Sequence, residues 1–328
     1  MGRLHIFNPD SDYALANGSQ WFTPPSPVVE LRRRLALLPA IYATPSEDAI
    51  LLLDPPRSEV ESLEHYNTAA SKNLRIFTLT DLGKKSLHIE NMTVEPWGWN
   101  MAMRRFVMNK IGNTPGLPTE YEMLRLRELS HRRTTVNFIE WLRSNSDIVK
   151  PEIETPEEIF RTEDAVSAFH RDPHRYFKSP WSSSGRGIML TNDLEARHVE
   201  PWVRGIIERQ GSVMMEKAYI RRLDFASEWI CKDGEAEFIG WSVFDASRRG
   251  KYHGQRTGSQ SELLCIIQES TRQNPATMVE AQRQALRALI APFYEGPLGI
   301  DMLTTENGAV NPCVEINLRH TMGMLNLL

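Results

Sequence analysis

Short apolar runs alternate with helix-like stretches over the first third of the chain. Residues 4–7 and 49–54 are predicted as buried strands, because each run is almost continuously apolar and ends at turn-forming residues. Residues 75–79 form a third candidate strand, and the apolar spacing over 28–38 and 99–111 is that of helices. Strands that alternate with helices predict an α/β first domain.

The pattern changes after residues 115–118, a proline- and glycine-bearing stretch that we take as a domain boundary. Residues 122–129 and 134–143 are predicted as helices, and Ser130 is the expected cap of the second. The division into domains is therefore 1–117, 118–215 and 216–328.

The rest of the chain mixes strands and helices. Residues 151–158 are predicted as a polar loop leading into a helix that begins near Thr155. The other predicted strands are 176–178, 188–190, 213–216, 225–231, 236–243, 298–304 and 310–317, and the other predicted helices are 195–210 and 276–293.

Composition narrows the class of protein. The 328 residues are 41% hydrophobic and 24% charged, with a net charge of −4, so no general positive field attracts nucleic acid or an anionic membrane. No apolar run has the length of a membrane helix, and the first residues lack a signal core. Three widely spaced cysteines argue against a disulfide framework, and we expect a cytoplasmic protein.

A lysine precedes a loop of small residues in Lys178-Ser-Pro-Trp-Ser-Ser-Ser-Gly-Arg-Gly-Ile188. Small residues let successive backbone N–H groups surround an anion, and Lys178 at the end of a strand would add a positive charge. The order differs from a P-loop, in which the lysine follows the glycines. A plain flexible turn explains the loop taken alone equally well.

Polar side chains alternate on the last predicted strand, where Glu315, Asn317 and Arg319 share one face. Asp301 lies on the preceding strand, and pairing of the two strands would bring it close to Glu315 and Asn317. Two carboxylates and an amide oxygen suit Mg²⁺ that is shared with phosphate oxygens. The alternative is a strand whose polar side chains face solvent.

Taken in order, these segments resemble the signature of the ATP-grasp superfamily. The resemblance rests on Lys178 with its glycine loop, Met215-Glu-Lys-Ala-Tyr-Ile220, Gly299-Ile-Asp301 and Glu315-Ile-Asn-Leu-Arg319, and covers about residues 129–323. It implies an α/β protein whose α+β lobes clasp ATP, preceded by a small α/β pre-grasp domain. The layout is similar to that of biotin carboxylase and the D-alanine–D-alanine ligases.

The resemblance also implies roles for single residues. Lys178 would contact the ATP phosphates beneath a flap formed by Ser184, Gly185, Arg186 and Gly187. Adenine would be recognised by Glu216, Lys217 and the backbone at Tyr219, and the ribose by Asp224. The magnesium ligands would be Asp301, Glu315 and Asn317. Arg319 matches an arginine that stabilises the reacting carboxylate or acyl phosphate.

Two further arginines are candidates. Arg132 stands where the family often has a phosphate-binding lysine, although a basic residue in the first turn of a helix explains it equally well. Arg256, in the polar stretch 251–259, is the strongest candidate there for clamping an anionic substrate, and a surface loop is the alternative.

The implied function is an ATP- and Mg²⁺-dependent ligase that joins a small-molecule carboxylate to an amine, or a related nucleophile, through an acyl phosphate. A kinase acting on a hydroxyl group and a non-catalytic, regulatory ATP-binding protein are the alternatives. Only five residues follow Gly323, so we expect either a minimal acceptor site or one completed by a partner such as a second copy of the chain.

Overall fold

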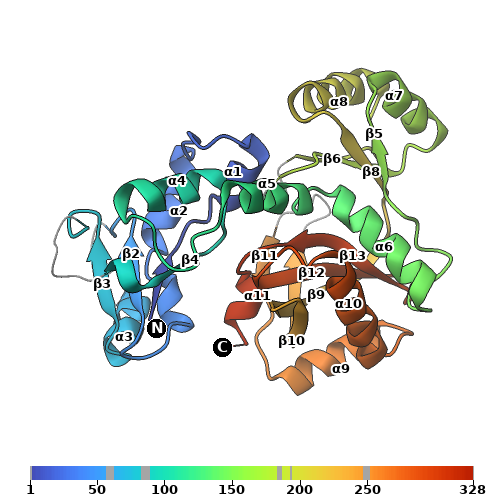
Figure 1. Ribbon diagram of the computed structural model, residues 1–328. Coiled ribbons are helices and arrows are strands. Elements are labelled where there is room, and N and C mark those ends of the chain that lie inside the picture. The colour runs from blue at the N-terminus through green and yellow to red at the C-terminus, as the bar shows by residue number, and fades with distance from the viewer. Residues whose placement is uncertain are drawn as a thin grey trace. The chain divides into compact units, whose positions relative to one another are not determined.

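The computed structural model describes residues 2–56, 63–82, 89–182, 187–192, 194–246 and 252–327 (Figure 1). The chain divides into two compact units, Met1–Arg127 and Glu128–Leu327, and each is described by itself. None of the helices in the described part of the chain is both long and apolar enough to cross a membrane.

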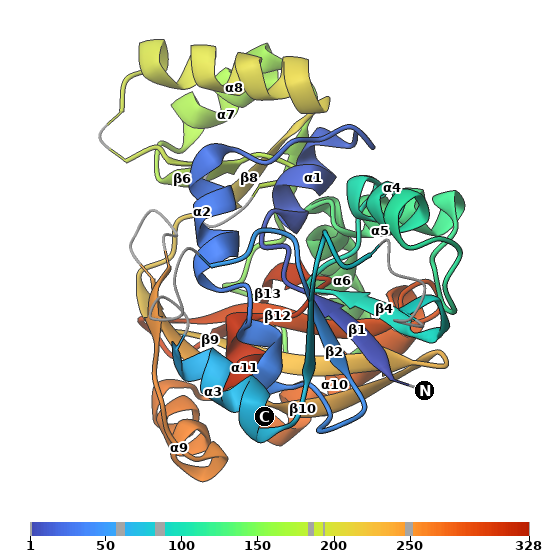
Figure 2. The same cartoon turned by 90° about the vertical axis from the view of Figure 1, so that its left-hand side faces the viewer.

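The first unit contains a four-stranded parallel sheet with the order β3-β2-β1-β4. Its strands are β1 (Arg3–Ile6), β2 (Ala49–Leu52), β3 (Arg75–Thr78) and β4 (Thr93–Pro96), and β1, β2 and β4 are labelled in Figure 2. Its helical segments are α1 (Ser11–Asn17), α2 (Ser26–Arg34), η1 (Leu38–Ile41), α3 (Leu63–Ser71), η4 (Ile89–Asn91) and α4 (Met101–Lys110), and α5 (Glu120–Leu129) runs across the boundary. The predicted α/β class and parallel sheet are confirmed.

Burial on both faces explains the continuous apolar run of β2. Ala49 and Leu51 belong to a core cluster that includes Val107 of α4. Ile50 and Leu52, which point to the opposite face, belong to a second cluster with Leu37 and Ala69. A parallel sheet covered on both faces requires this pattern.

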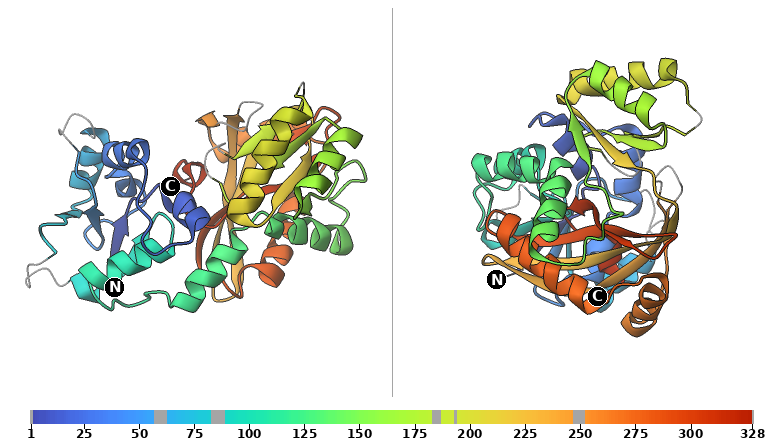
Figure 3. Two further views of the ribbon diagram at one scale, coloured as in Figure 1. Left: turned by 90° about the horizontal axis from the view of Figure 1, so that it is seen from above. Right: turned by 90° about the vertical axis from the view of Figure 1, so that its right-hand side faces the viewer.

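The second unit begins with a smaller antiparallel sheet in the order β5-β8-β6-β7. Its strands are β5 (Glu157–Ile159), β6 (Arg175–Lys178), β7 (Ile188–Leu190) and β8 (Val213–Lys217). Helices α7 (Thr162–Arg171) and α8 (Ala196–Gln210) lie side by side over this sheet and bury one face of it in a shared core (Figure 3).

A five-stranded antiparallel sheet follows, in the order β11-β10-β9-β12-β13. Its strands are β9 (Arg221–Lys232), β10 (Glu235–Ala246), β11 (Tyr252–Gln255), β12 (Gly296–Thr305) and β13 (Val310–Asn317). The helices of this part are α6 (Arg133–Asn145), α9 (Gln260–Ser270), α10 (Pro275–Leu289) and α11 (Met322–Leu325).

Helix α10 is joined to this sheet by one fully buried polar side chain. The Gln282 amide group donates to the Pro312 carbonyl at 2.9 Å and accepts from the Ser227 hydroxyl at 3.0 Å. The polar groups are therefore satisfied inside the core, as burial demands.

Two local predictions are wrong. Residues 157–159 form strand β5 and the next helix begins at Thr162, because β5 pairs with the distant strand β8, which no local pattern reveals. Ser130 does not cap α6, whose N-cap position is Arg132. Helix α9 was not predicted, although Ser259 and Glu262 form a capping box at its start.

Candidate active site

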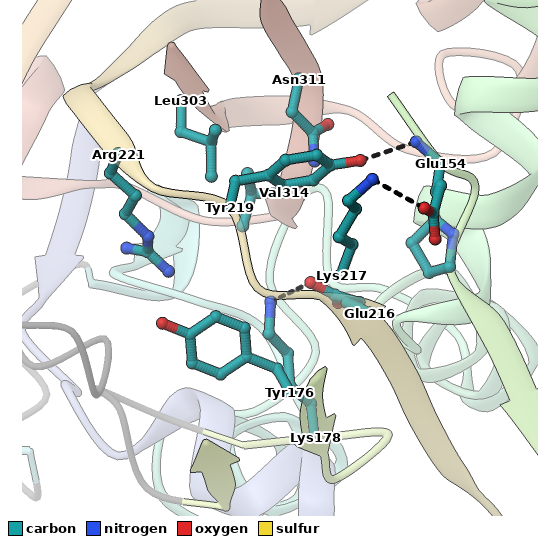
Figure 4. Close-up of a pocket in the computed structure, with 11 residues that line it drawn as sticks. Glu154, Tyr176, Lys178, Glu216, Lys217, Tyr219, Arg221, Leu303, Asn311 and Val314 are labelled. Atoms are coloured by element: carbon teal, nitrogen blue, oxygen red, sulfur yellow. Dashed lines mark hydrogen bonds and ion pairs between the residues drawn. The ribbon is translucent and has the colours of Figure 1, made fainter. Parts of the chain in front are cut away.

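One pocket of the second unit is lined by residues from both of its sheets (Figure 4). Lys178 ends β6, Glu216 and Lys217 end β8, and Tyr219 follows in the connector to β9. The full lining is Glu154, Pro156, Tyr176, Lys178, Glu216, Lys217, Tyr219, Arg221, Leu303, Asn311 and Val314. Four residues that the resemblance assigns to nucleotide binding therefore line the same pocket.

Glu154 organises one wall of this pocket, as Figure 4 shows. Its carboxylate lies 2.9 Å from the Lys217 ammonium group, and its backbone N–H donates to the Tyr219 hydroxyl oxygen at 2.6 Å. Burial raises the pKa of Tyr219 to about 12, so its hydroxyl stays neutral at ordinary pH. Glu154 was not singled out in the sequence, since it lies far from the hinge residues along the chain.

Lys178 is buried, with 3% of its surface exposed, and its ammonium group contacts the Glu216 carboxylate. Burial lowers the pKa of Lys178, and the negative charge of Glu216 acts in the opposite direction. An anion that enters beside Lys178 would add negative charge there and so favour the protonated form of the lysine.

Arg132 connects the glycine loop with the last strand. Its guanidinium group donates to the Ser179 carbonyl at 3.1 Å and to the Ser182 hydroxyl at 2.9 Å, and it lies 2.8 Å from the Glu315 carboxylate. The side chain is 5% exposed, yet its Nη1 atom has no hydrogen-bond partner in the described part of the chain. A buried guanidinium with an unmatched donor is suited to take an anion.

The acidic residues of β12 and β13 meet as the alternation predicts. Asp301 lies opposite Glu315, and Gly299 lies opposite Asn317. The Asn317 amide group donates to Asp301 at 3.2 Å, and its oxygen accepts from Arg319 at 3.0 Å. Asp301, Glu315, Asn317 and Arg319 are thus neighbours.

The site around Asp301 favours a cation. Burial raises the pKa of Asp301 to about 8, and the negative charges of Glu315 and Glu228 act in the same direction. A positive charge bound between these carboxylates would oppose all three effects.

The residues present fit a magnesium ion. Asp301, Glu315 and Asn317 carry oxygens of the hard type that Mg²⁺ prefers, and these side chains could serve as its ligands. Within the described ranges, no cluster of three His, Cys, Asp or Glu side chains is arranged to hold a metal by itself. The three side chains would fill part of a magnesium coordination sphere, and phosphate oxygens would complete it.

Asp224 lies one step along the same face of the sheet. It pairs with Leu303 on β12, whereas Ala226 pairs with Asp301, so Asp224 lies about 7 Å along the strand from the row of Asp301. Its carboxylate is 3.2 Å from Arg221. Burial raises the pKa of Asp224, and the charge of Arg221 acts against this rise.

The structure describes only one residue of the predicted flap. Ser184, Gly185 and Arg186 lie outside the described residues. Gly187 is described; it has a left-handed φ of +69°, and a Cβ atom there would lie 2.6 Å from the Ser179 hydroxyl.

Arg256 lies just beyond β11, where its guanidinium is 3.1 Å from Asp245. Strands β10 and β9 separate β11 from β12 in the sheet. The structure therefore does not place Arg256 beside the Asp301 and Glu315 carboxylates.

Comparisons by sequence find no relative, since no protein-family model and no curated protein matches the chain. Comparison of structures finds proteins of similar fold. N5-carboxyaminoimidazole synthetase from Staphylococcus aureus aligns over 98% of this chain and 71% of its own, with a TM-score of 0.53 and 11% identity. The chain has the ATP-grasp fold.

Two other similar structures agree. Biotin carboxylase from Campylobacter jejuni aligns over 99% of this chain and 67% of its own, with a TM-score of 0.52 and 13% identity. Phosphoribosylamine–glycine ligase from Thermotoga maritima aligns over 99% and 70%, with a TM-score of 0.52 and 11% identity. The superfamily resemblance seen in the sequence is confirmed at the level of the fold.

Proposed function

We propose that the protein is an ATP- and Mg²⁺-dependent ligase that joins a small-molecule carboxylate to an amine through an acyl phosphate. One observation supports this most strongly: within one unit, Arg132 contacts both the loop after Lys178 and Glu315, a candidate magnesium ligand. The candidate phosphate-binding cations and the candidate oxygen ligands for a metal thus occur together. The ATP-grasp fold of the chain is consistent with this chemistry.

The pocket residues would hold the nucleotide in one orientation. We assign the base to the wall formed by Glu216, Lys217 and Tyr219. We assign the ribose hydroxyls to Asp224, which pairs with the pocket residue Leu303. Lys178 and Arg132 would then face the phosphates, since both cations lie next to Ser179 and the start of the glycine loop.

The reaction would proceed in two balanced steps. A carboxylate oxygen attacks the γ-phosphorus, the bond to the β-phosphate oxygen breaks, and ADP leaves. An amine then attacks the acyl carbon and loses a proton, and the bond from this carbon to the phosphate oxygen breaks. The products are an amide and inorganic phosphate. Lys178, Arg132 and Arg319 would stabilise the anionic charge, and bound Mg²⁺ would neutralise phosphate charge.

The cysteines bear on the cellular setting. Cys231 and Cys313 are buried free thiols and Cys265 is an exposed one, which suits a reducing compartment. We therefore propose a cytoplasmic enzyme, with a second copy of the chain as the candidate partner on the acceptor side. Arg256 is kept as a candidate substrate clamp.

The test is a product screen. The protein is incubated with ATP and Mg²⁺ together with amino acids and small carboxylates, singly and in pairs, and the products are identified by mass spectrometry. A ligase gives ADP, free phosphate and a condensed product. ADP with a phosphorylated acceptor would identify a kinase, and ATP binding without turnover would identify a regulatory protein.

A further inference from the structure

A second buried acid lies on the face of the sheet that carries Asp301. Glu228 on β9 is 1% exposed, and its two carboxylate oxygens accept hydrogen bonds from the Ser242 hydroxyl at 2.8 Å and the Thr321 hydroxyl at 2.7 Å. Burial raises the pKa of Glu228, while both hydroxyl donors and the charge of Arg319 act against this rise. An apolar side chain would avoid the desolvation cost that this carboxylate incurs.

The surrounding backbone leaves room for this carboxylate. A Cβ atom at Gly323 would lie 2.0 Å from one Glu228 oxygen, and a Cβ atom at Gly299 would lie 2.8 Å from the other. Neither glycine could be replaced by alanine without displacing the carboxylate. The two glycines therefore provide the space that the Glu228 carboxylate occupies.

The strand register gives the position of Glu228 along the site. Leu303, which lines the nucleotide pocket, pairs with Asp224; Asp301 pairs with Ala226; and Gly299 pairs with Glu228. Each row lies about 7 Å from the next. Glu228 therefore lies one row beyond Asp301, on the side away from the pocket that Leu303 lines.

The contact with Thr321 links Glu228 to the segment that follows β13. Thr321 accepts a hydrogen bond from the Met324 N–H at 3.0 Å and so caps α11, while it donates to Glu228. It stands two residues after Arg319, the side chain assigned to the reacting anion. Glu228 thus fixes the backbone immediately downstream of Arg319.

We propose that Glu228 is a positioning residue, which holds Arg319 through Thr321 so that its guanidinium meets the substrate carboxylate or the acyl phosphate. The inference rests on the proposed function, because the anion that Arg319 would bind arises only in that reaction. Glu228 itself touches no reacting atom. Its removal should therefore slow the chemical step more than it weakens nucleotide binding.

The test compares Glu228→Gln, Thr321→Val and Thr321→Ser with Glu237→Gln, a control at an exposed acid of the neighbouring strand β10. Magnesium-dependent ADP release is measured with the amino-acid and carboxylate mixture, and affinity for the ATP analogue AMP-PNP with Mg²⁺ is measured by calorimetry. Hydrogen exchange of the segment 319–326 is followed in the same proteins.

We expect Glu228→Gln and Thr321→Val to lower kcat by about tenfold or more, with KM for ATP and analogue affinity within about twofold of wild type. Exchange at the Met324 amide should accelerate, and Thr321→Ser, which keeps the hydroxyl, should restore both kcat and protection. If Glu228→Gln fails to fold, the two Thr321 variants decide the question by the same criteria.

Wild-type kcat in both Glu228→Gln and Thr321→Val would overturn the inference. So would a parallel loss of kcat and analogue affinity, which indicates a purely structural role. If the wild-type protein itself releases no ADP, the proposed function fails. The exchange data then still show whether Glu228 orders the segment after Arg319. Exchange in Glu228→Gln that equals that of the wild type would overturn the role of the contact between Glu228 and Thr321 as well.

Discussion

Lys178 shows how one side chain can be prepared for a ligand before the ligand arrives. It is buried against the Glu216 carboxylate, and Arg132 is close enough for its positive charge to help lower the Lys178 pKa. Two cations held near each other lose part of their mutual repulsion when a polyanion binds between them. The phosphates would therefore find positive charge already ordered.

The first prediction concerns this lysine. Lys178→Ala should weaken AMP-PNP binding about 30-fold, since a charge-assisted contact contributes ~2 kcal/mol and Glu216 loses its partner. Calorimetry measures the effect. Arg197→Ala, which removes an exposed arginine with a side chain 72% exposed, is the control and should leave the affinity unchanged. Equal AMP-PNP affinity in Lys178→Ala and the wild type would show that Lys178 does not bind the nucleotide.

A second prediction concerns pH and the stability of the first unit. Burial alone would raise the pKa of Asp48, but hydrogen bonds from His5 and from the backbone N–H groups of Thr44 and Arg3 outweigh it, and the pKa is lowered. The stabilisation from a lowered carboxyl pKa is complete above the unfolded-state value of about 4 and is lost as the pH falls below it.

Asp48→Asn should therefore lower the free energy of unfolding by about 2 kcal/mol at pH 7, and its difference from wild type should shrink as the pH falls from about 4. Urea unfolding at pH 7, 5 and 3 measures this, with Glu47→Gln at the adjacent exposed position as the control. A difference that grows toward acid pH would contradict the assignment.

At the scale of elements, Arg132 joins α6 and the glycine loop to β13. The Arg132 guanidinium lies beside the Glu315 carboxylate, so a metal ion that binds Glu315 would have to compete with Arg132. A bound phosphate group that attracts Arg132 would relieve this competition. Nucleotide and metal should therefore each favour the binding of the other.

Arg132→Ala tests this coupling. Without nucleotide, the variant should bind Mn²⁺ about fivefold more tightly than wild type, the factor for ~1 kcal/mol, because Glu315 no longer has a competing cation. Its AMP-PNP affinity should fall. Electron paramagnetic resonance of free Mn²⁺ gives the first value and calorimetry the second. Weaker Mn²⁺ binding in the variant would refute the competition, and Arg161→Ala serves as the control.

Elements with a strong local period were predictable, and those that depend on distant partners were not. Residues 310–317 were predicted as a strand, and the alternation of polar side chains placed Glu315 and Asn317 on one face of it, which the register confirms. Strand β5 is short and polar, and exists because β8 pairs with it. The role of Glu228 was not predictable for the same reason. Residues 225–231 were predicted as a strand, but the hydroxyl groups that donate to Glu228 come from β10 and from Thr321.

At the scale of the whole molecule, fold similarity extends much further than sequence similarity. The S. aureus synthetase aligns with 98% of this chain at 11% identity, whereas comparisons by sequence find no relative. What the sequence retained was the order of short polar motifs. The substrate leaves no comparable trace, because its specificity depends on side chains brought together from several elements.

In the proposed enzyme, Asp301, Glu315 and Asn317 would hold a magnesium ion beside a nucleotide bound by Lys178 and Arg132. The most direct measurement is the affinity for AMP-PNP with and without Mg²⁺, in the wild-type protein and in Glu315→Gln. The account predicts that Mg²⁺ strengthens binding to the wild type at least about tenfold and that Glu315→Gln loses this gain while its metal-free affinity stays within about threefold. A full magnesium effect in Glu315→Gln would contradict it.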